Sequence, residues 1–373
     1  MHSVAAFTDT YLPTVNGVTY TVKTWRDRWQ ARGGRMDVVY PGASGYSPDD
    51  GEHPVRSLPF PFYDGFRFGL PRVPSSVGPV DVVHAHTPFA LGLAGARLAG
   101  RADTPFVASY HTPTGEYASY LTSRGPIEDR IEALSERYER WFFSKADAVV
   151  VPSEATRRYL LDEVEVHERG PHTRVRVVPN GVDVERFRPV DGDEFRSQYR
   201  LGDGPLVGYT GRHGYEKCLS DVLDAVAGLD VTVVFGGDGP AREALEREAD
   251  DRGLDAHFLG FLDREELPGF YSALDAFLFP SPVETQGLVA LEANACGTPV
   301  VGVDAGALSG TIEEGVTGYH YPEGDMDAFR DAIRRTLEER ESLRESCLAR
   351  REAISVENAV DELATVYDDV LAG

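Results

Sequence analysis

Cysteine and lysine are both scarce in this chain. Its three cysteines, Cys218, Cys296 and Cys347, stand far apart in the sequence, so neither the close spacing of a zinc motif nor a disulfide framework is present. We expect all three to be small core residues. Lysine occurs at only three positions, although Lys+Arg together number 37, so arginine carries almost all of the positive charge.

Positive charge as a whole is also in short supply. The 61 Asp+Glu residues exceed the 37 Lys+Arg and give a formal net charge of -24. Such a chain repels the phosphates of a nucleic acid, which argues against a nucleic-acid partner. Few lysines beside many arginines and aspartates favour a halophilic protein, because at ~1 M salt the Debye length is ~3 Å and self-repulsion is screened. A merely acidic mesophilic protein is the alternative.

Long apolar runs are absent as well. No stretch of ~18 apolar residues could span a bilayer, and the first residues lead into a short strand rather than a signal segment. We therefore expect a cytoplasmic protein. Its 373 residues allow two sizeable domains, each with a core of its own.

Short apolar strands alternate with helix-length amphipathic segments, which is the pattern of parallel α/β sheets. Strands are predicted in the first half at 3–8, 36–40, 80–84, 106–110, 146–151 and 175–178, and in the second half at 205–210, 231–235, 256–259, 277–279 and 299–303. The polar stretch 188–204 between the two sets is the expected linker. The pattern therefore predicts two facing Rossmann-like domains, 1–187 and 188–355.

Two glutamates, Glu284 and Glu292, stand eight positions apart around a possible helix start at Gly287 and Leu288. Free N–H groups at a helix start can bind a diphosphate, and Glu292 could accept two ribose hydroxyls. Were the whole segment helical, the two carboxylates would be roughly 12 Å apart and would hold different ends of one ligand. An ordinary buried helix is the alternative. The flanking strands favour a site, because ligands in open α/β sheets bind at the carboxyl ends of strands.

Polar groups follow other predicted strands too. Arg212 and Lys217 come after 205–210 and could neutralise a departing diphosphate without a metal; pairing with surface aspartates is the alternative. In the first half, the turn at Gly17 lies between a strand and a helix, where backbone can approach a phosphate. His111 ends a strand and could contact a sugar or an acceptor, or be a structural histidine.

Metal binding is disfavoured. The pair His84 and His86 has a possible ligand spacing, but no cluster of carboxylates or cysteines completes a set. The pairs Asp191/Asp193 and Asp325/Asp327 follow no strand of the first domain. We interpret both as solvated, the first in the linker and the second as a helix cap.

Taken together, the motifs resemble those of glycosyltransferase family 4 over nearly the whole chain. They are 13–18, 84–88, 111–112, 178–183, 211–217, 237–240 and 284–292. The resemblance implies a GT-B fold and retaining transfer of a hexose from a UDP- or GDP-sugar to an acceptor hydroxyl. It implies no obligatory cofactor or metal. It further implies a C-terminal helix, near 356–371, that returns to the first domain.

Carried over to this chain, the resemblance implies four groups at the diphosphate. Arg212 and Lys217 would bind it by charge, while Gly287 and Leu288 would offer backbone N–H groups. In two places the chain departs from the family pattern: Cys218 stands where glycine is usual, and Ser309-Gly310 replaces the usual Pro-Glu.

The remaining implied contacts concern the rest of the donor. Glu284 would touch hydroxyls of the transferred sugar, His111 would lie beside that sugar, and Glu292 would hold the ribose. Gly17 would lie near the donor diphosphate or the acceptor. His111, Glu284, Arg212 and Lys217 are therefore the predicted catalytic residues.

Within the family, the opening 7–18 and the aromatic run 59–71 resemble members that glycosylate lipids, namely mannosyl, glucosyl and sulfoquinovosyl transferases. A lipid or glycolipid is thus the expected acceptor, and the aromatic run could lie in a membrane interface. It could equally be a packed flap. Two other functions stay open: a non-hydrolysing nucleotide-sugar 2-epimerase and a catalytically silent nucleotide-sugar binding protein.

Overall fold

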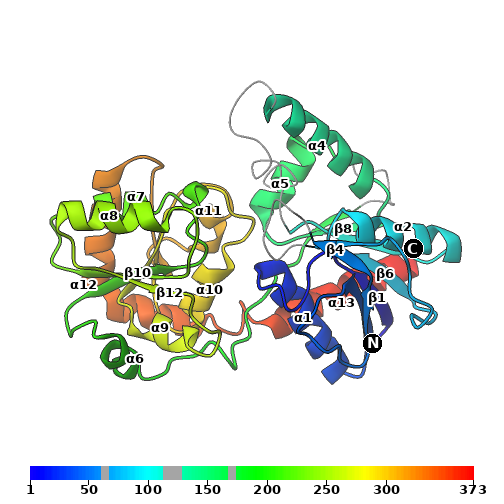
Figure 1. Ribbon diagram of the computed structural model, residues 1–373, viewed down its shortest axis with the longest axis horizontal. Helices are drawn as coiled ribbons and strands as arrows, with labels where there is room; N and C mark the ends of the chain where they lie inside the picture. Colours follow the sequence, from blue (N-terminus) through cyan, green and yellow to red (C-terminus); the bar gives the residue numbers. More distant parts are fainter. Residues whose placement is uncertain (60–66, 112–127, 167–173) are drawn as a thin grey trace. The chain divides into compact units, whose positions relative to one another are not determined.

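A computed structural model describes residues 1–59, 67–111, 128–166 and 174–373 of the chain. Contacts divide it into two compact units (Figure 1): Met1–Asn180 together with Val356–Gly373, and Gly181–Ser355. Residues 181–187, which the sequence analysis assigned to the first domain, group with the second unit, because Phe187 is buried in its core.

The first unit contains a seven-stranded parallel sheet in the order β3-β2-β1-β6-β7-β8-β9. Its strands are β1 (Ser3–Phe7), β2 (Arg35–Pro41), β3 (Glu52–Val55), β6 (Val82–Ala85), β7 (Phe106–Ser109), β8 (Ala148–Val151) and β9 (Arg174–Val177). The helices are α1 (Gly17–Ala31), α2 (Ala90–Ala102), α4 (Glu128–Phe143), α5 (Glu154–Asp162) and α13 (Val356–Ala372). A short antiparallel pair, β4 (Ser57–Pro59) and β5 (Arg67–Gly69), completes the unit.

Alternate residues of β1 enter two separate cores, one on each face of the sheet. Ala5 and Phe7 belong to a cluster that includes residues of α2 and α4. Val4 and Ala6 belong to another, which includes residues of α1 and α13. The period of two along the strand therefore explains why both faces are covered by helices.

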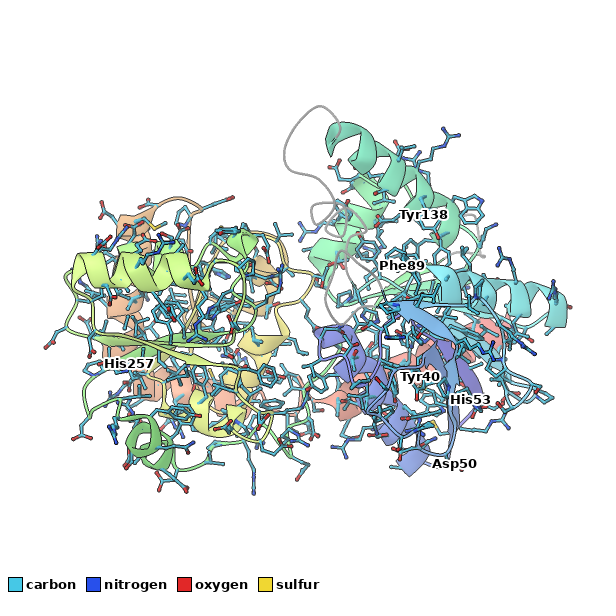
Figure 2. The ribbon with its side chains drawn as sticks, viewed as in Figure 1. Tyr40, Asp50, His53, Phe89, Tyr138 and His257 are labelled. Atoms are coloured by element: carbon cyan, nitrogen blue, oxygen red, sulfur yellow. The ribbon has the colours of Figure 1, made fainter. Side chains whose placement is uncertain are left out.

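Helix α13 packs beside α1 on this second face. On the other face, Tyr138 of α4 donates a hydrogen bond to the carbonyl of Pro88, next to Phe89 at the start of α2 (Figure 2). The sequence expectation of a C-terminal helix returning to the first domain is thus confirmed, at Val356–Ala372.

The second unit contains a six-stranded parallel sheet in the order β12-β11-β10-β13-β14-β15. Its strands are β10 (Leu206–Thr210), β11 (Thr232–Gly236), β12 (Ala256–Gly260), β13 (Ala276–Phe279), β14 (Val300–Val303) and β15 (Gly318–Tyr321). The helices are α6 (Gly192–Tyr199), the 3-10 turn η1 (Tyr215–Lys217), α7 (Ser220–Val226), α8 (Arg242–Arg252), α9 (Leu267–Ala273), α10 (Leu288–Ala295), α11 (Leu308–Thr311) and α12 (Met326–Ala349).

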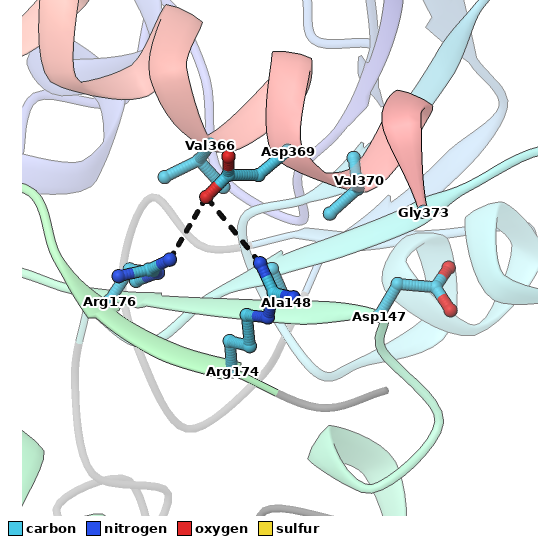
Figure 3. A pocket seen from close by; sticks show the side chains of 8 residues that line it. All are labelled: Asp147, Ala148, Arg174, Arg176, Val366, Asp369, Val370 and Gly373. Carbon is cyan, nitrogen blue, oxygen red and sulfur yellow. Dashed lines mark hydrogen bonds and ion pairs between the residues drawn. The ribbon is translucent and has the colours of Figure 1, made fainter. Parts of the chain in front are cut away.

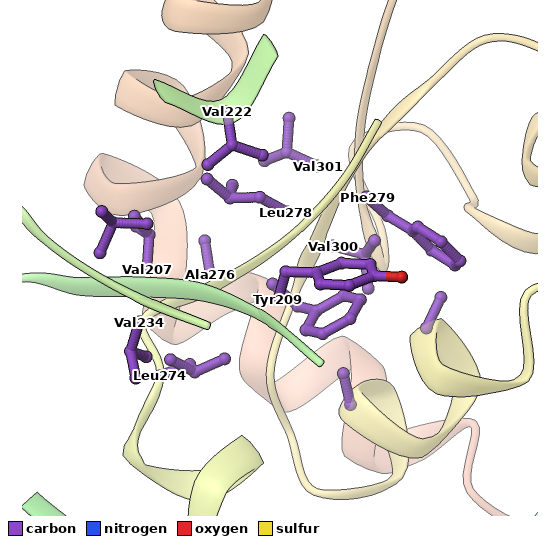
Figure 4. Packing of buried hydrophobic residues seen from close by; sticks show 14 of the residues in the cluster. Val207, Tyr209, Val222, Val234, Leu274, Ala276, Leu278, Phe279, Val300 and Val301 are labelled. Atoms are coloured by element: carbon purple, nitrogen blue, oxygen red, sulfur yellow. The ribbon is translucent and has the colours of Figure 1, made fainter. Parts of the chain in front are cut away.

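One continuous apolar core fills this unit. Tyr209 of β10 stacks on Phe277 of β13 at a centroid distance of 5.9 Å, among valines and leucines of the neighbouring strands (Figure 4). The strands are short and apolar because both faces of a parallel sheet are buried.

All eleven predicted strands are present with ends shifted by one or two residues, and the two-domain α/β fold is confirmed. The prediction that 188–204 is a linker is wrong. Helix α6 lies inside it, with Asp191 as its N-cap, and Phe195 packs into the second core. Leu201 is buried in the same core, so two apolar side chains anchor a stretch whose composition resembles a linker.

Both sheets reverse their strand order at one point. In the first the reversal lies between β1 and β6, and in the second between β10 and β13. The chain leaves these pairs of strands in opposite directions, which opens a crevice at their carboxyl ends where ligands of such sheets bind. The residues that follow β10 and β13 are therefore the first place to look for a site.

Candidate active site

Lys217 and Glu284 meet at the reversal point of the second sheet. Lys217 follows β10 and Glu284 follows β13. The Lys217 Nζ atom lies 2.7 Å from Oε1 of Glu284, and their side chains are 18% and 17% exposed. The sequence placed one of these groups on a diphosphate and the other on a sugar. The structure brings them together as a partly desolvated ion pair, so a ligand that engages either one changes the environment of the other.

Arg212 lies in the same connection after β10. It forms an ion pair with Glu216, four residues on, and its side chain is 32% exposed. In these two ion pairs the partners of Arg212 and Lys217 are glutamates of the same region, Glu216 and Glu284, rather than surface aspartates.

Cys218 ends the 3-10 turn that carries Lys217. Its backbone has φ 51° and ψ 35°, in the left-handed region. Glycine adopts this conformation readily and other residues do not, which explains why glycine is usual at this position in the family that the motifs resemble. Cys218 is only partly buried, whereas Cys296 and Cys347 are buried as expected.

Helix α10 begins at Leu288, with Gly287 as its N-cap at φ 74°. A Cβ on Gly287 would lie 2.7 Å from Leu308 Cδ2, so glycine is required there on steric as well as conformational grounds. No side chain of a described residue caps this helix start, and its first N–H groups are therefore suited to an anion. The predicted helix start at Gly287 and Leu288 is thus confirmed, and Glu284 precedes the helix, so the segment from Glu284 to Glu292 is not helical throughout.

Glu292 lies in the second turn of α10 and is only 6% exposed. Burial raises the pKa of its carboxyl to about 7, and the positive charge of Arg264 acts in the opposite direction. The Tyr271 hydroxyl donates a hydrogen bond of 2.9 Å to Oε2. The sequence did not single out Tyr271, because nothing in the apolar helix α9 distinguishes this tyrosine from a core residue.

In the first unit, Gly17 is the exposed first residue of α1. The Asn16 side chain caps the helix by accepting a hydrogen bond of 2.9 Å from the Thr19 N–H. Among the described residues, none has an atom within 4 Å of a Cβ added to Gly17. A ligand can therefore approach this helix start closely.

His111 follows β7 and is the last described residue before the gap at 112–127. Desolvation lowers the pKa of its imidazole to about 4, although a hydrogen bond with the Asn180 side chain acts in the opposite direction. Its Nε2 atom lies 3.2 Å from Nδ1 of His86. The sequence spacing of His84 and His86 indicated only a weak metal motif, and no pattern in the sequence connects His86 with His111.

Several expectations concern residues or groups that the structure does not place. Thr112, Pro113 and residues 60–66 of the aromatic run lie outside the described residues. Within the part of the chain that is described, no three or more His, Cys, Asp or Glu side chains are grouped to hold a metal ion. In that same part, none of the helices combines the length and the apolar character that crossing a bilayer requires.

Comparison with known proteins identifies the class to which this fold and this site belong. Residues 191–351 match the sequence model of the glycosyl transferases group 1, and residues 15–186 match that of glycosyltransferase family 4. The chain is 31% identical to a GDP-mannose-dependent alpha-mannosyltransferase of Mycobacterium tuberculosis, over 98% of this chain and 96% of that protein. The protein is thus a glycosyltransferase. It belongs to glycosyltransferase family 4.

Other relatives are named for other transferred sugars, and the name of one of them specifies a glycosylated diacylglycerol. An alpha-monoglucosyldiacylglycerol synthase of Streptococcus pneumoniae is 29% identical over 87% of this chain and 76% of its own length. A sulfoquinovosyl transferase of Arabidopsis thaliana is 33% identical over 77% of this chain, which spans 56% of that longer protein. The epimerase and the silent binding protein considered above find no support among these names.

The fold itself is matched closely. A sucrose-phosphate synthase from Thermosynechococcus elongatus superposes with a TM-score of 0.80 over 99% of both chains, at 22% sequence identity. The catalytic domain of a starch synthase from Arabidopsis thaliana superposes with a TM-score of 0.73 over the full length of both. The expectation of a GT-B fold is therefore confirmed.

Proposed function

We propose that this protein transfers a hexose from a UDP- or GDP-sugar to a hydroxyl group of a lipid or glycolipid, with retention of the anomeric configuration. The observation that carries the proposal is the Lys217–Glu284 ion pair at the strand reversal of the second unit. The names of the relatives in Streptococcus pneumoniae and Arabidopsis thaliana support a lipid acceptor.

The second unit supplies the groups that a nucleotide diphosphate needs. Lys217 and Arg212 neutralise the leaving diphosphate, and the N–H groups at the start of α10 bind its oxygens. To do so the phosphates compete with Glu284 for Lys217 and with Glu216 for Arg212. Released from Lys217, the Glu284 carboxylate is free to accept hydrogen bonds from sugar hydroxyls. No metal ion is required in this scheme, since the two cations supply the charge.

Glu292 holds the ribose. Its buried carboxylate already accepts a hydrogen bond from Tyr271 at Oε2, and its remaining lone pairs suit the two ribose hydroxyls. In the first unit, Gly17 allows close approach to a diphosphate or an acceptor, and His111 contacts the transferred sugar. These roles follow from the family resemblance and, for Gly17 and His111, from their positions after β1 and β7.

We further propose contact with a membrane surface by the first unit. Leu58, Phe68 and Leu70 are 66%, 44% and 48% exposed. Leu58 directly precedes the aromatic run 59–71, and the other two belong to it. Large apolar side chains at the surface are suited to the interfacial region of a bilayer. The net charge of −24 opposes binding to anionic lipid unless salt screens it, so we propose that this contact operates at molar salt.

The function is tested with purified protein in about 2 M KCl, where the Debye length is below about 3 Å. A panel of UDP- and GDP-sugars is offered with a lipid extract, and mass spectrometry follows the released nucleotide and the glycosylated lipid. The proposal predicts a new lipid glycoside with one donor of the panel. Formation of a 2-epimer without an acceptor, or nucleotide binding with no turnover on any donor, would contradict it. NMR of the product's anomeric proton tests retention.

A further inference from the structure

Three histidines of the first unit, His84, His86 and the partly buried His111, form one stack. The rings of His84 and His86 lie 4.1 Å apart between centroids, and those of His86 and His111 lie 5.5 Å apart and are nearly parallel at 11°. Trp25 of α1 borders all three rings at 5.8–6.4 Å. His84 and His86 are at most 1% exposed. The family motifs contain these histidines, but the donor contacts proposed above use only His111.

The innermost ring is fixed at both nitrogens. Nδ1 of His84 lies 2.6 Å from the Tyr367 hydroxyl on α13, and Nε2 lies 2.7 Å from the Ser109 hydroxyl. A ring held at two points and stacked on its neighbour restricts how His86 can turn. His86 in turn faces His111 across the 3.2 Å contact between Nδ1 and Nε2.

The hydrogen-bond pattern determines which nitrogen of His86 carries the proton. Nε2 of His86 is buried and has no hydrogen-bond partner in the part of the chain that the structure describes. A proton there would be a buried donor without an acceptor, which is destabilising, whereas a bare lone pair is tolerated better. The proton therefore lies on Nδ1 and points at Nε2 of His111. Nε2 of His111 must then be the acceptor, which leaves Nδ1 as its protonated nitrogen.

We propose that His86 is a positioning residue that donates its Nδ1 proton to His111 and so holds His111 as the Nδ1-protonated tautomer, a hydrogen-bond donor toward the donor sugar. The proposal rests on the proposed function, in which His111 contacts that sugar. The Asn180 side chain also interacts with the His111 ring, through a hydrogen bond that raises the pKa of the imidazole. The backbone carbonyl of Asn180 accepts a hydrogen bond of 2.8 Å from the Trp25 indole N–H.

The chemical consequence is that His111 does not serve as a base. Its Nε2 lone pair is occupied by His86, and desolvation keeps the pKa of all three imidazoles below the usual range of histidine. The stack thus remains neutral at pH 7 and presents an N–H of defined direction. A sugar hydroxyl can serve as the acceptor of that N–H.

Two variants of one position separate the hydrogen bond from the packing. In His86→Asn, the amide N–H replaces the Nδ1–H of the imidazole, whereas His86→Leu keeps a side chain of similar bulk without a donor. With the active donor and acceptor from the panel above, we expect His86→Leu to lower kcat on the order of 10-fold, because misplacing a reacting contact by ~1 Å can cost up to 10²-fold. His86→Asn should keep most of the turnover. In a His111→Ala background, His86→Leu should cause no further loss.

The tautomer is measured directly on the full chain labelled with ¹⁵N-histidine, with the His111 signals assigned by their loss in His111→Ala. We expect a one-bond proton correlation at Nδ1 and none at Nε2. Protonation at Nε2, or equal kcat for His86→Leu and His86→Asn while His111→Ala lowers it, would overturn the inference. Unchanged kcat in His111→Ala would instead refute the proposed contact between His111 and the sugar. His111 would then not be a hydrogen-bond donor to that sugar.

Discussion

The left-handed backbone of Cys218 places a strained residue directly beside the site lysine. A residue with a Cβ in this region of backbone conformation destabilises the folded state by roughly 1–2 kcal/mol. Replacing it with glycine removes this cost, but glycine also has greater freedom in the unfolded chain, which offsets part of the gain. Cys218→Gly should therefore raise the free energy of unfolding by about 0.5–1 kcal/mol. Urea denaturation measures the gain. Cys218→Ala is the control, since it removes the thiol but keeps the Cβ; an equal gain in both variants would rule out backbone strain as the cause.

Lys217 is the site lysine in a chain that has only three. If it stabilises the leaving diphosphate, Lys217→Ala should lower the rate at saturating donor by roughly 10²-fold, as for other preorganised electrostatic groups. EDTA should leave turnover intact. The matched control is Lys145→Ala, because Lys145 lies over the Trp141 ring in the first unit and should leave the rate unchanged. Activity abolished by EDTA and restored by Mn²⁺ would show that a metal performs this task.

The buried carboxyl of Glu292 should make the free energy of unfolding depend on pH. Burial raises the pKa of its carboxyl from 4.5 to about 7 in the folded protein, so between these values the folded state binds a proton that the unfolded state has released. Stability therefore falls as pH rises from about 4.5 to about 7 and the burial penalty is complete above that range. Glu292→Gln removes the penalty. The difference in thermal midpoint between variant and parent should widen from pH 5 to 7; a constant difference would contradict the raised pKa.

At the scale of elements, α13 is attached to the first unit by two kinds of contact. Tyr367 is buried and hydrogen-bonds to His84, whereas Asp369 pairs with Arg174 and Arg176 at a small pocket on the surface (Figure 3). Surface ion pairs contribute about 0–1 kcal/mol, while a buried group left without its partner costs about 1–3 kcal/mol.

Tyr367→Phe should therefore lower the free energy of unfolding by about 1–3 kcal/mol, and Asp369→Asn by less than about 1 kcal/mol. Both variants alter side chains of the same helix, one buried and one at the surface. Comparing their free energies of unfolding therefore measures the effect of the hydrogen bond between Tyr367 and His84. Chemical denaturation of the full chain gives both values. The opposite order would mean that the surface pair, rather than the buried one, holds α13 in place.

The elements also show where sequence reasoning succeeds. The central strands were predictable because they are apolar on both faces, and Lys217 and Glu284 because each follows such a strand. β3 was missed, since its Glu52 is polar; its carboxylate is buried against Arg26 and two tyrosine hydroxyls. Contacts such as Tyr271 with Glu292 depend on how two helices pack, and no local pattern in either helix records that.

At the scale of the whole molecule, the excess of carboxylates predicts a dependence on salt. Salt screens the repulsion that arises from a net charge of −24, and it also weakens surface ion pairs. Because like charges are in excess, the loss of repulsion should outweigh the loss of ion pairs. The thermal midpoint should rise between 0.1 M and 2 M KCl, by about 2–4 °C for each kcal/mol of repulsion removed. Sorbitol at equal osmolality is the control for solvent exclusion. A midpoint that is constant or falls in KCl would favour an ordinary acidic protein.

The return of α13 to the first unit has a consequence for how the protein is made. A ribosome completes residues 1–180 first, yet the helix that covers one face of their sheet is synthesised only after the whole of Gly181–Ser355. Domains generally fold as units during synthesis, at about 5–20 residues per second. Here the second unit can finish folding while the first unit still exposes one apolar face of its sheet. In the complete protein, Val360 and Tyr367 of α13 belong to the core on that face. The unit that emerges first is the last to be completed.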